Sequence, residues 1–288
     1  MKKLIGIFAA FAMVLSCAMT AAAAEWNFYG NARVGTFVHD TDNPGAADTQ
    51  TLSENLQSNS RIGAKVKVSD ELRGRFEYGT GVNVRHLFGE WDFGAGKLLV
   101  GQTYTPMEYG VSNQVFNDDN GLGDYGSTSV GRNPMIRLTF GGFKIAAVAP
   151  EEDDLGTGGT IEHDLPKIEA AYAFDFDNIA FEIGAGYNEY EIISGAQTYD
   201  VDSWVISLGA EASFGAFYCL GSVYTGENLG SYGFDTASDS SPSISGTTLN
   251  DNDGFGYNLE CGGRFNLFES APFFLYRPFW HMVMKLIR

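Results

Sequence analysis

The stretch NSRIGAKVKVSDELRGRFEYG, residues 59–79, decides the fold because two alternating runs flank a short polar turn. Each run places apolar side chains on one face and charged ones on the other. The apolar set is Ile62, Ala64, Val66, Val68, Leu72, Phe76 and Tyr78, and the charged set is Arg61, Lys65, Lys67, Arg73, Arg75 and Glu77. A period of two is typical of half-buried β-strands. The stretch therefore predicts two neighbouring antiparallel strands.

Working outward, the pattern recurs in twelve runs, at roughly 26–38, 58–68, 72–79, 84–93, 97–104, 132–140, 143–149, 166–174, 179–190, 200–214, 216–225 and 254–265. The runs Val84 to Phe93 and Phe217 to Tyr224 change parity midway, which predicts β-bulges. Aromatic residues near the run ends are candidates for an interfacial girdle: Trp26, Phe28, Trp91, Phe93, Phe214, Phe217, Phe265 and Phe268.

The connections between runs are sorted by length. Those after even-numbered runs are tight, whereas most after odd-numbered runs are long and polar, notably 39–57, 105–131, 150–165 and 226–253. Alternation alone fits both a soluble sandwich and a membrane barrel. Short turns at one end and long loops at the other are typical of outer-membrane barrels. We therefore predict an all-β fold, an antiparallel transmembrane β-barrel with about twelve readable strands.

The composition argues against several classes of function. The chain has 36 acidic and 18 basic residues, a net charge of −18, which does not suit a nucleic-acid-binding surface. The four histidines fit no metal-binding spacing, and the glycine pattern at 121–126 lacks the strand-then-helix context of a dinucleotide site. We predict no enzymatic activity, no cofactor and no metal site.

The two ends of the chain differ from the body. Residues 1–24 have a basic start, an apolar stretch and a small-residue cleavage site, which predicts a secretory signal peptide. A cut before Cys17, which would make a lipoprotein, fits less well. Removing Lys2 and Lys3 with the peptide takes the net charge from −18 to −20. Residues 25–270 form the expected barrel, and residues 271–288, with no acid, no glycine and no alternation, form an atypical tail.

Only Cys219 and Cys261 remain after removal of the signal peptide. Two cysteines do not make a disulfide scaffold of the kind that small secreted domains need. The strand pairing places them on neighbouring strands at similar depth. We expect two small apolar side chains facing lipid.

Over residues 26–145 the chain resembles the general bacterial porins, trimeric outer-membrane barrels for passive diffusion. The motifs that carry the resemblance are YGNARVG, NSRIGAKV, RGRFEYG, VRHLFGEWDFGAGKLLVGQTYTP, PMEYG, VGR and FGGF, in that order. Family members usually have sixteen strands and end in an aromatic residue. This chain offers about twelve and ends in Arg288, so the resemblance implies a C-terminally truncated or altered porin.

The resemblance also implies a pore constriction. In the family, the loop after strand 5 bends into the lumen and carries acids opposite a basic wall. Glu108 in PMEYG matches the acidic position, and Asp118, Asp119 and Asp124 lie in the same loop. Arg61, Arg85 and Arg132 match the basic cluster, and Arg33 lies on the same face as Asn31, which replaces a common lysine. Arg73 and Arg75 join the basic wall by parity, although all these arginines could also be ordinary wall charges paired with Glu77 and other acids.

The function expected from these observations is a water-filled channel for ions and small hydrophilic solutes in the cell outer membrane. The expected partners are outer-membrane lipid and lipopolysaccharide, the passing solutes and two further copies in a homotrimer, and no nucleic acid. Two alternatives stay open. One is a non-conducting outer-membrane barrel, either an anchor or a truncated remnant, and the other is a secreted soluble β-sandwich that binds carbohydrate.

Overall fold

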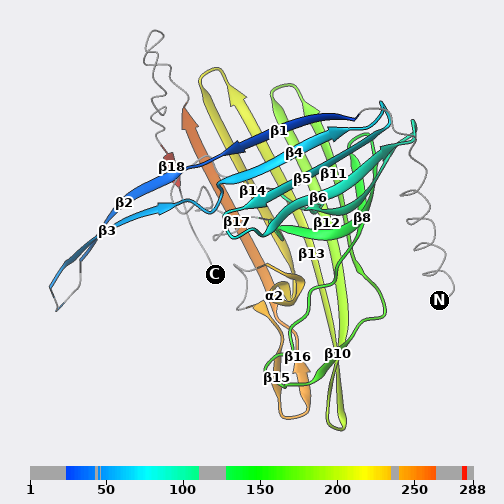
Figure 1. The fold of residues 1–288 in the computed structure, drawn as a ribbon. Helices are drawn as coiled ribbons and strands as arrows, with labels where there is room; N and C mark the ends of the chain where they lie inside the picture. Colours follow the sequence, from blue (N-terminus) through cyan, green and yellow to red (C-terminus); the bar gives the residue numbers. More distant parts are fainter. Residues whose placement is uncertain are drawn as a thin grey trace.

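A single curved antiparallel sheet dominates the computed structural model, which describes residues 24–42, 45, 47–109, 128–234, 240–263 and 281–283 (Figure 1). Strands that are neighbours in the sheet mostly follow one another in the chain. In sheet order they are β1 (Glu25–Asn31), β4 (Arg61–Lys67), β5 (Leu72–Gly79), β6 (Val84–Asp92), β7 (Lys97–Tyr104), β8 (Arg132–Phe140), β9 (Phe143–Val148), β11 (Lys167–Phe176), β12 (Ile179–Ser194), β13 (Gln197–Phe214), β14 (Phe217–Glu227), β17 (Asp253–Gly263) and β18 (His281–Val283).

The exposure of apolar and polar side chains on the two faces of the sheet is the reverse of that in a soluble protein. Large apolar side chains are exposed along the outer face, for example Leu87, Val100, Ile136, Ile206 and Leu208. Charged and polar side chains are buried on the inner face, for example Glu77, Glu90, Lys167, Glu169 and Glu260. In a soluble sandwich the apolar face would be the buried one. This arrangement is that of a transmembrane barrel, whose apolar face meets lipid, and the predicted fold class is confirmed.

One of the two predicted bulges is present. Glu77 pairs with His86 but Tyr78 pairs with Val84, so Arg85 is an extra residue in β6. The bulge predicted in Phe217 to Tyr224 is wrong, because β14 pairs without a break with both β13 and β17. Its inner face alternates regularly through Tyr218, Leu220, Ser222 and Tyr224. The apparent change of parity arose because large residues such as Tyr218 and Leu220 lie on the inner face.

The first predicted run is wrong in its extent. It divides at Ala32–Arg33 into β1 and a second strand, β2 (Val34–Thr41). The predicted loop 39–57 contains β3 (Thr49–Leu56), which pairs with β2 in a hairpin separate from the main sheet. Polar residues such as Thr51, Ser53 and Asn55 are the reason why the sequence pattern predicts a loop here. Figure 1 shows the hairpin extending away from the sheet.

Other predicted long loops also carry regular structure. The connection at 150–165 contains β10 (Thr160–Glu162), which pairs with β12. The strands β12 and β13 are longer than expected and meet at a turn at Gly195. The connection at 226–253 contains α2 (Leu229–Tyr232) and the hairpin of β15 (Ser243–Ser245) and β16 (Thr248–Asn250). Among the described residues no helix is long and apolar enough to cross a membrane. In the predicted tail, the described residues 281–283 form β18, which pairs with β17.

The aromatic residues near the run ends lie mostly on the outer face. Trp26, Phe28, Trp91, Phe214 and Phe217 are exposed there, close to the short-turn end of the sheet. Phe265 and Phe268 lie outside the described residues. Exposed aromatic rings at this height suit a membrane interface.

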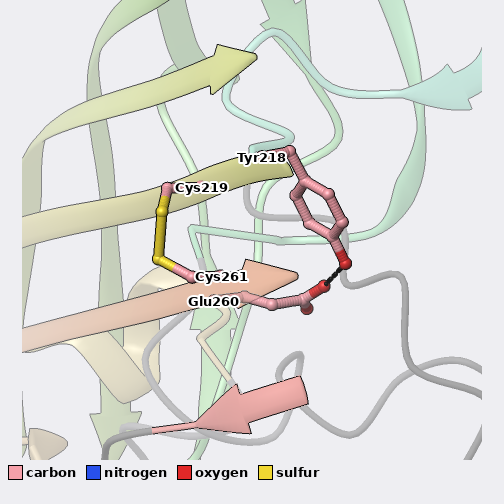
Figure 2. Close-up of a disulfide and its surroundings, with 4 residues drawn as sticks. All are labelled: Tyr218, Cys219, Glu260 and Cys261. Carbon is pink, nitrogen blue, oxygen red and sulfur yellow. Dashed lines mark hydrogen bonds between the residues drawn. A yellow bond between two sulfur atoms is a disulfide. The ribbon is translucent and has the colours of Figure 1, made fainter. Parts of the chain in front are cut away.

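The two cysteines lie directly opposite each other, as predicted, but they form a disulfide rather than two free thiols. Cys219 on β14 and Cys261 on β17 have Cα atoms 4.1 Å apart. The neighbouring Tyr218 donates a hydrogen bond to Glu260 at 2.7 Å on the inner face. Figure 2 shows the disulfide and this polar pair on opposite sides of the two strands. The disulfide therefore lies on the outer face, four residues beyond the turn at Gly215.

Replacing both cysteines by serine is expected to lower thermal stability, because the bond closes a segment with a sequence separation of 42 residues. The chain-entropy relation gives an upper value of about 4 kcal/mol for a loop of that size. The check is the temperature at which the folded band disappears from unboiled electrophoresis samples, compared between the wild type and Cys219→Ser/Cys261→Ser. Reduction of the wild type should reproduce the loss, and equal transition temperatures in all three samples would contradict it.

Candidate functional site

The connection after β7 crosses the inner side of the sheet. Its first limb, Thr105–Tyr109, starts beside β7, yet the Tyr109 ring lies against Gly209 on β13. Those two strands are five strand spacings apart, about 24 Å along a sheet. The limb can extend over at most about 14 Å. It must therefore take the short path across the concave side, and the sheet is curved around it.

Glycines on β12 and β13 leave the space in which the limb lies against these strands. A methyl group at Gly209 would collide with the Tyr109 ring, and one at Gly184 would press on Met107. Tyr109 also forms an isolated antiparallel bridge with Thr128 on the returning limb. The two limbs are thus paired where they reach the wall. The tip of the loop, with Asp118, Asp119 and Asp124, lies outside the described residues.

Glu77 is the centre of the basic wall. Its side chain is fully buried and receives three guanidinium groups, from Arg75 at 2.6 Å, Arg85 at 2.8 Å and Arg61 at 3.7 Å. The hydroxyl group of Tyr29 donates to the same carboxylate at 2.7 Å and accepts from Arg75 Nε at 2.7 Å. Three positive charges around one carboxylate leave an excess of positive charge at this point of the wall.

The bulge in β6 makes this cluster possible. Successive residues of a regular strand point to opposite faces. Because Arg85 is the extra residue, both it and His86 reach Glu77, with His86 Nε2 at 3.8 Å. His86 Nδ1 is hydrogen-bonded to Thr103 Oγ1 at 2.9 Å. A local irregularity thus adds one more cation to the wall than alternation would allow.

Two further predicted arginines lie elsewhere. Arg73 is ion-paired with Glu90, and Arg137 approaches the same carboxylate at 3.9 Å. Arg73 thus belongs to a second ion-pair cluster, nearer the short-turn end than the Glu77 cluster. Arg33 lies in the break between β1 and β2, where its backbone N–H donates to Ser60 Oγ at 2.9 Å.

Glu108 lies on the first limb of the inward loop, and Arg132 is the first residue of β8, where the loop returns to the sheet. The Arg132 guanidinium stacks on the Tyr104 ring at 4.2 Å and donates to the Tyr104 hydroxyl group. Glu108 accepts a hydrogen bond from Ser129 Oγ at 2.6 Å. Burial raises the pKa of Glu108 to about 7, although Ser129 and the positive charge of Arg132 act in the opposite direction. The carboxyl group therefore changes charge near neutral pH.

The inner face also holds functional candidates that the sequence did not reveal. Lys167 and Glu169 are fully buried on β11, 3.7 Å apart, and Met107 donates its backbone N–H to Glu169 at 3.4 Å. Parity along β11 would have placed both on the inner face, but nothing in the sequence indicated their contact with the loop. Nothing in the sequence indicated that Tyr232 and Phe234 are buried on the inner face, because their connection has no periodic pattern. Within the described residues no group of acids, histidines and cysteines could hold a metal ion.

Comparisons with known proteins agree with this architecture. A sequence profile of the family described as Gram-negative porin matches residues 9–260. No curated protein sequence matches the chain significantly. The fold is similar to the outer membrane channel DcaP of Acinetobacter baumannii, with a TM-score of 0.64 at 16% identity over 87% of this chain and 76% of that one.

Two other solved structures are similar in the same way. OmpF of Salmonella typhi gives a TM-score of 0.53 at 15% identity over 84% of this chain and 75% of that one. A structure described as a porin gives 0.52 at 20% identity over 84% of this chain and 80% of that one. At these identities the likeness concerns the fold.

Glu108 is expected to release its proton around pH 7, well above an ordinary glutamate, because its charged form is poorly solvated. The infrared band of the protonated carboxyl group, followed against pH, measures this, and Glu108→Gln should remove that step. Ser129→Ala removes a hydrogen bond that favours the carboxylate, so it should move the midpoint to higher pH. A midpoint near pH 4.5 in the wild type would refute the buried setting of Glu108.

Proposed function

We propose that the chain, which belongs to the Gram-negative porin family, passes ions and small hydrophilic solutes through a pore. The selectivity of this pore is set where the inward loop faces the arginines around Glu77. The family and the fold make it an outer-membrane channel protein for small solutes. The finer part of the proposal concerns which residues select the solute. The observation that carries it is the cluster of Arg61, Arg75 and Arg85 around the single carboxylate of Glu77.

Charge on opposite sides of a narrow passage creates a transverse field. The arginine cluster and Arg132 supply the positive side, and the loop acids Glu108, Asp118, Asp119 and Asp124 supply the negative side in this proposal. Low-dielectric walls focus such a field, so that polar solutes are oriented and charged ones are filtered. Because Glu108 gains its charge near pH 7, the negative side strengthens as pH rises.

The assembly belongs to the same proposal. The homotrimer expected from the family resemblance, and contacts with outer-membrane lipid and lipopolysaccharide, are predictions for this chain. The trimer is tested by the mass of the detergent-solubilised protein before and after boiling. Binding of lipopolysaccharide is tested by its co-purification from outer membranes.

A second candidate function is a barrel that does not conduct. It is favoured by an apolar cluster on the inner face, in which Met107 of the inward loop packs with Leu229, Tyr232 and Phe234 of a second loop. Apolar material inside a barrel reduces the space for water. Conductance separates the two candidates, since a plugged barrel gives none.

Planar bilayer recordings test the proposed pore. The wild type should give stable conductance steps, and Arg85→Gln should shift selectivity towards cations. Removing one charge about 8 Å from the ion path in water is worth about 0.5 kcal/mol, roughly a twofold change in permeability ratio. Arg85→Lys keeps the charge and should keep the selectivity. Lys67→Gln, at the exposed short-turn end of β4 beside Asp70, is the control away from the Glu77 cluster.

The proposed role of Glu108 predicts a change in ion selectivity that depends on pH. Glu108→Gln should shift selectivity towards anions above pH 7 and change little at pH 5, where the wild-type carboxyl group is already protonated. Reversal potentials in a salt gradient measure this. An equal shift at both pH values would argue for altered packing rather than lost charge, and no shift at either would remove Glu108 from the selectivity role.

A further inference from the structure

Two loops from distant parts of the chain meet on the inner face of the sheet. Met107 belongs to the loop after β7, and α2 belongs to the loop after β14, 125 residues further on. Both reach the same wall, formed by β12 and β13. They share one buried apolar cluster that consists of Met107, Val205, Tyr224, Leu229, Tyr232 and Phe234.

Tyr232 is the centre of that contact. Its side chain is fully buried, and its hydroxyl group lies 3.5 Å from Met107 Sδ. Its ring stacks on Phe234 at 5.6 Å and lies beneath the ammonium group of Lys167 at 4.9 Å. Gly186 on β12 leaves the space that the phenol occupies, since a methyl group there would collide with it. The wall is thus shaped to hold this tyrosine.

The short helix is also fixed at both ends by polar contacts. The Asn228 amide group donates to the Asp202 carbonyl group and to Asp251 Oδ1, both at 2.8 Å. The Asn188 amide group, on β12, donates to the Ser231 carbonyl group at 3.2 Å. Lys167 Nζ donates to the Tyr232 carbonyl group at 3.3 Å. The helix is therefore attached to the strands of the wall through Asp202, Asn188 and Lys167, and to its own loop through Asp251.

The first limb of the inward loop is held from two sides. The wall holds it through Glu169, which accepts the Met107 backbone N–H, and through the niche at Gly184. On the remaining side Met107 meets Tyr232, and the next residue is Glu108. Removing the tyrosine ring would leave the Met107 side chain without its apolar partner, and large-to-small changes in such clusters are costly because the cavity is not refilled.

We propose that α2, through Tyr232, is a positioning element that holds the limb 105–109 in place, so that the second loop sets the position of Glu108 in the pore. This inference rests on the proposed pore function. Tyr232 itself lies beneath the limb and does not touch the solute. The loop after β14 thereby becomes a determinant of pore width and selectivity.

The first test uses single-channel recordings of Tyr232→Ala, Tyr232→Phe and Ile244→Ala. Ile244 is on the same second loop and packs in a different cluster with Tyr190 and Ile192. With the ring removed, the limb should move, giving severalfold larger open-channel current noise and loss of the pH-dependent selectivity step of Glu108. Tyr232→Phe keeps the ring and should restore the quiet current, and Ile244→Ala should match the wild type.

The second test does not require conduction. Met107 is about 1% exposed, so Met107→Cys should react slowly with a water-soluble maleimide in the folded protein. Adding Tyr232→Ala should raise the labelling rate at least tenfold, whereas adding Ile244→Ala should not. The native cysteines are joined in a disulfide and do not compete. Boiled and unboiled electrophoresis confirms that each variant still forms the folded barrel.

The outcomes separate the two proposals. A wild type that does not conduct overturns the pore function, and the labelling rates then still decide whether α2 holds the limb. A conducting wild type with unchanged noise, selectivity step and labelling rate in Tyr232→Ala overturns the positioning role alone.

Discussion

The pairing of backbone groups in one uninterrupted sheet is the constraint on which the rest of the structure depends. The outer face is apolar, so no water is available there to satisfy an unpaired N–H or C=O group. Antiparallel neighbours from β1 to β17 supply those partners strand by strand. Side chains are then divided between the faces by a period of two alone. Inward-directed charges that are buried each need a partner, as Glu77, Lys167 and Glu260 each have.

Much of this could be predicted from the sequence, because a period of two is a local property. The alternation of Arg73, Arg75 and Glu77 with Leu72, Phe76 and Tyr78 placed the charged face correctly, and the parity change in β6 located the bulge that brings Arg85 to Glu77. Prediction was poorest where local pattern and environment diverge. The β2–β3 hairpin was missed because its residues are polar, and β14 was misread because its inner face carries Tyr218 and Leu220. The contact of Tyr232 with Met107 joins residues 125 apart and leaves no periodic trace.

The inward segments show how a barrel can shape its interior without lengthening its strands. Glycines on β12 and β13 remove side chains where Met107, Tyr109 and Tyr232 must come close to the wall. The loops after β7 and β14 fill the space that these glycines leave. The interior is accordingly asymmetric, because the inward loops pack on β12–β14 and the arginines around Glu77 lie on β4–β6.

The disulfide has a consequence for the order in which the protein is made. Thiol–disulfide exchange proceeds through a thiolate, which forms in water and not in hydrocarbon. Cys219 and Cys261 are on the outer face, which lipid covers in the assembled barrel. Oxidation is therefore faster before that face enters the membrane, when water still reaches both thiols. Formation of the bond before insertion would require β14 and β17 to be in register while the outer face is still in water.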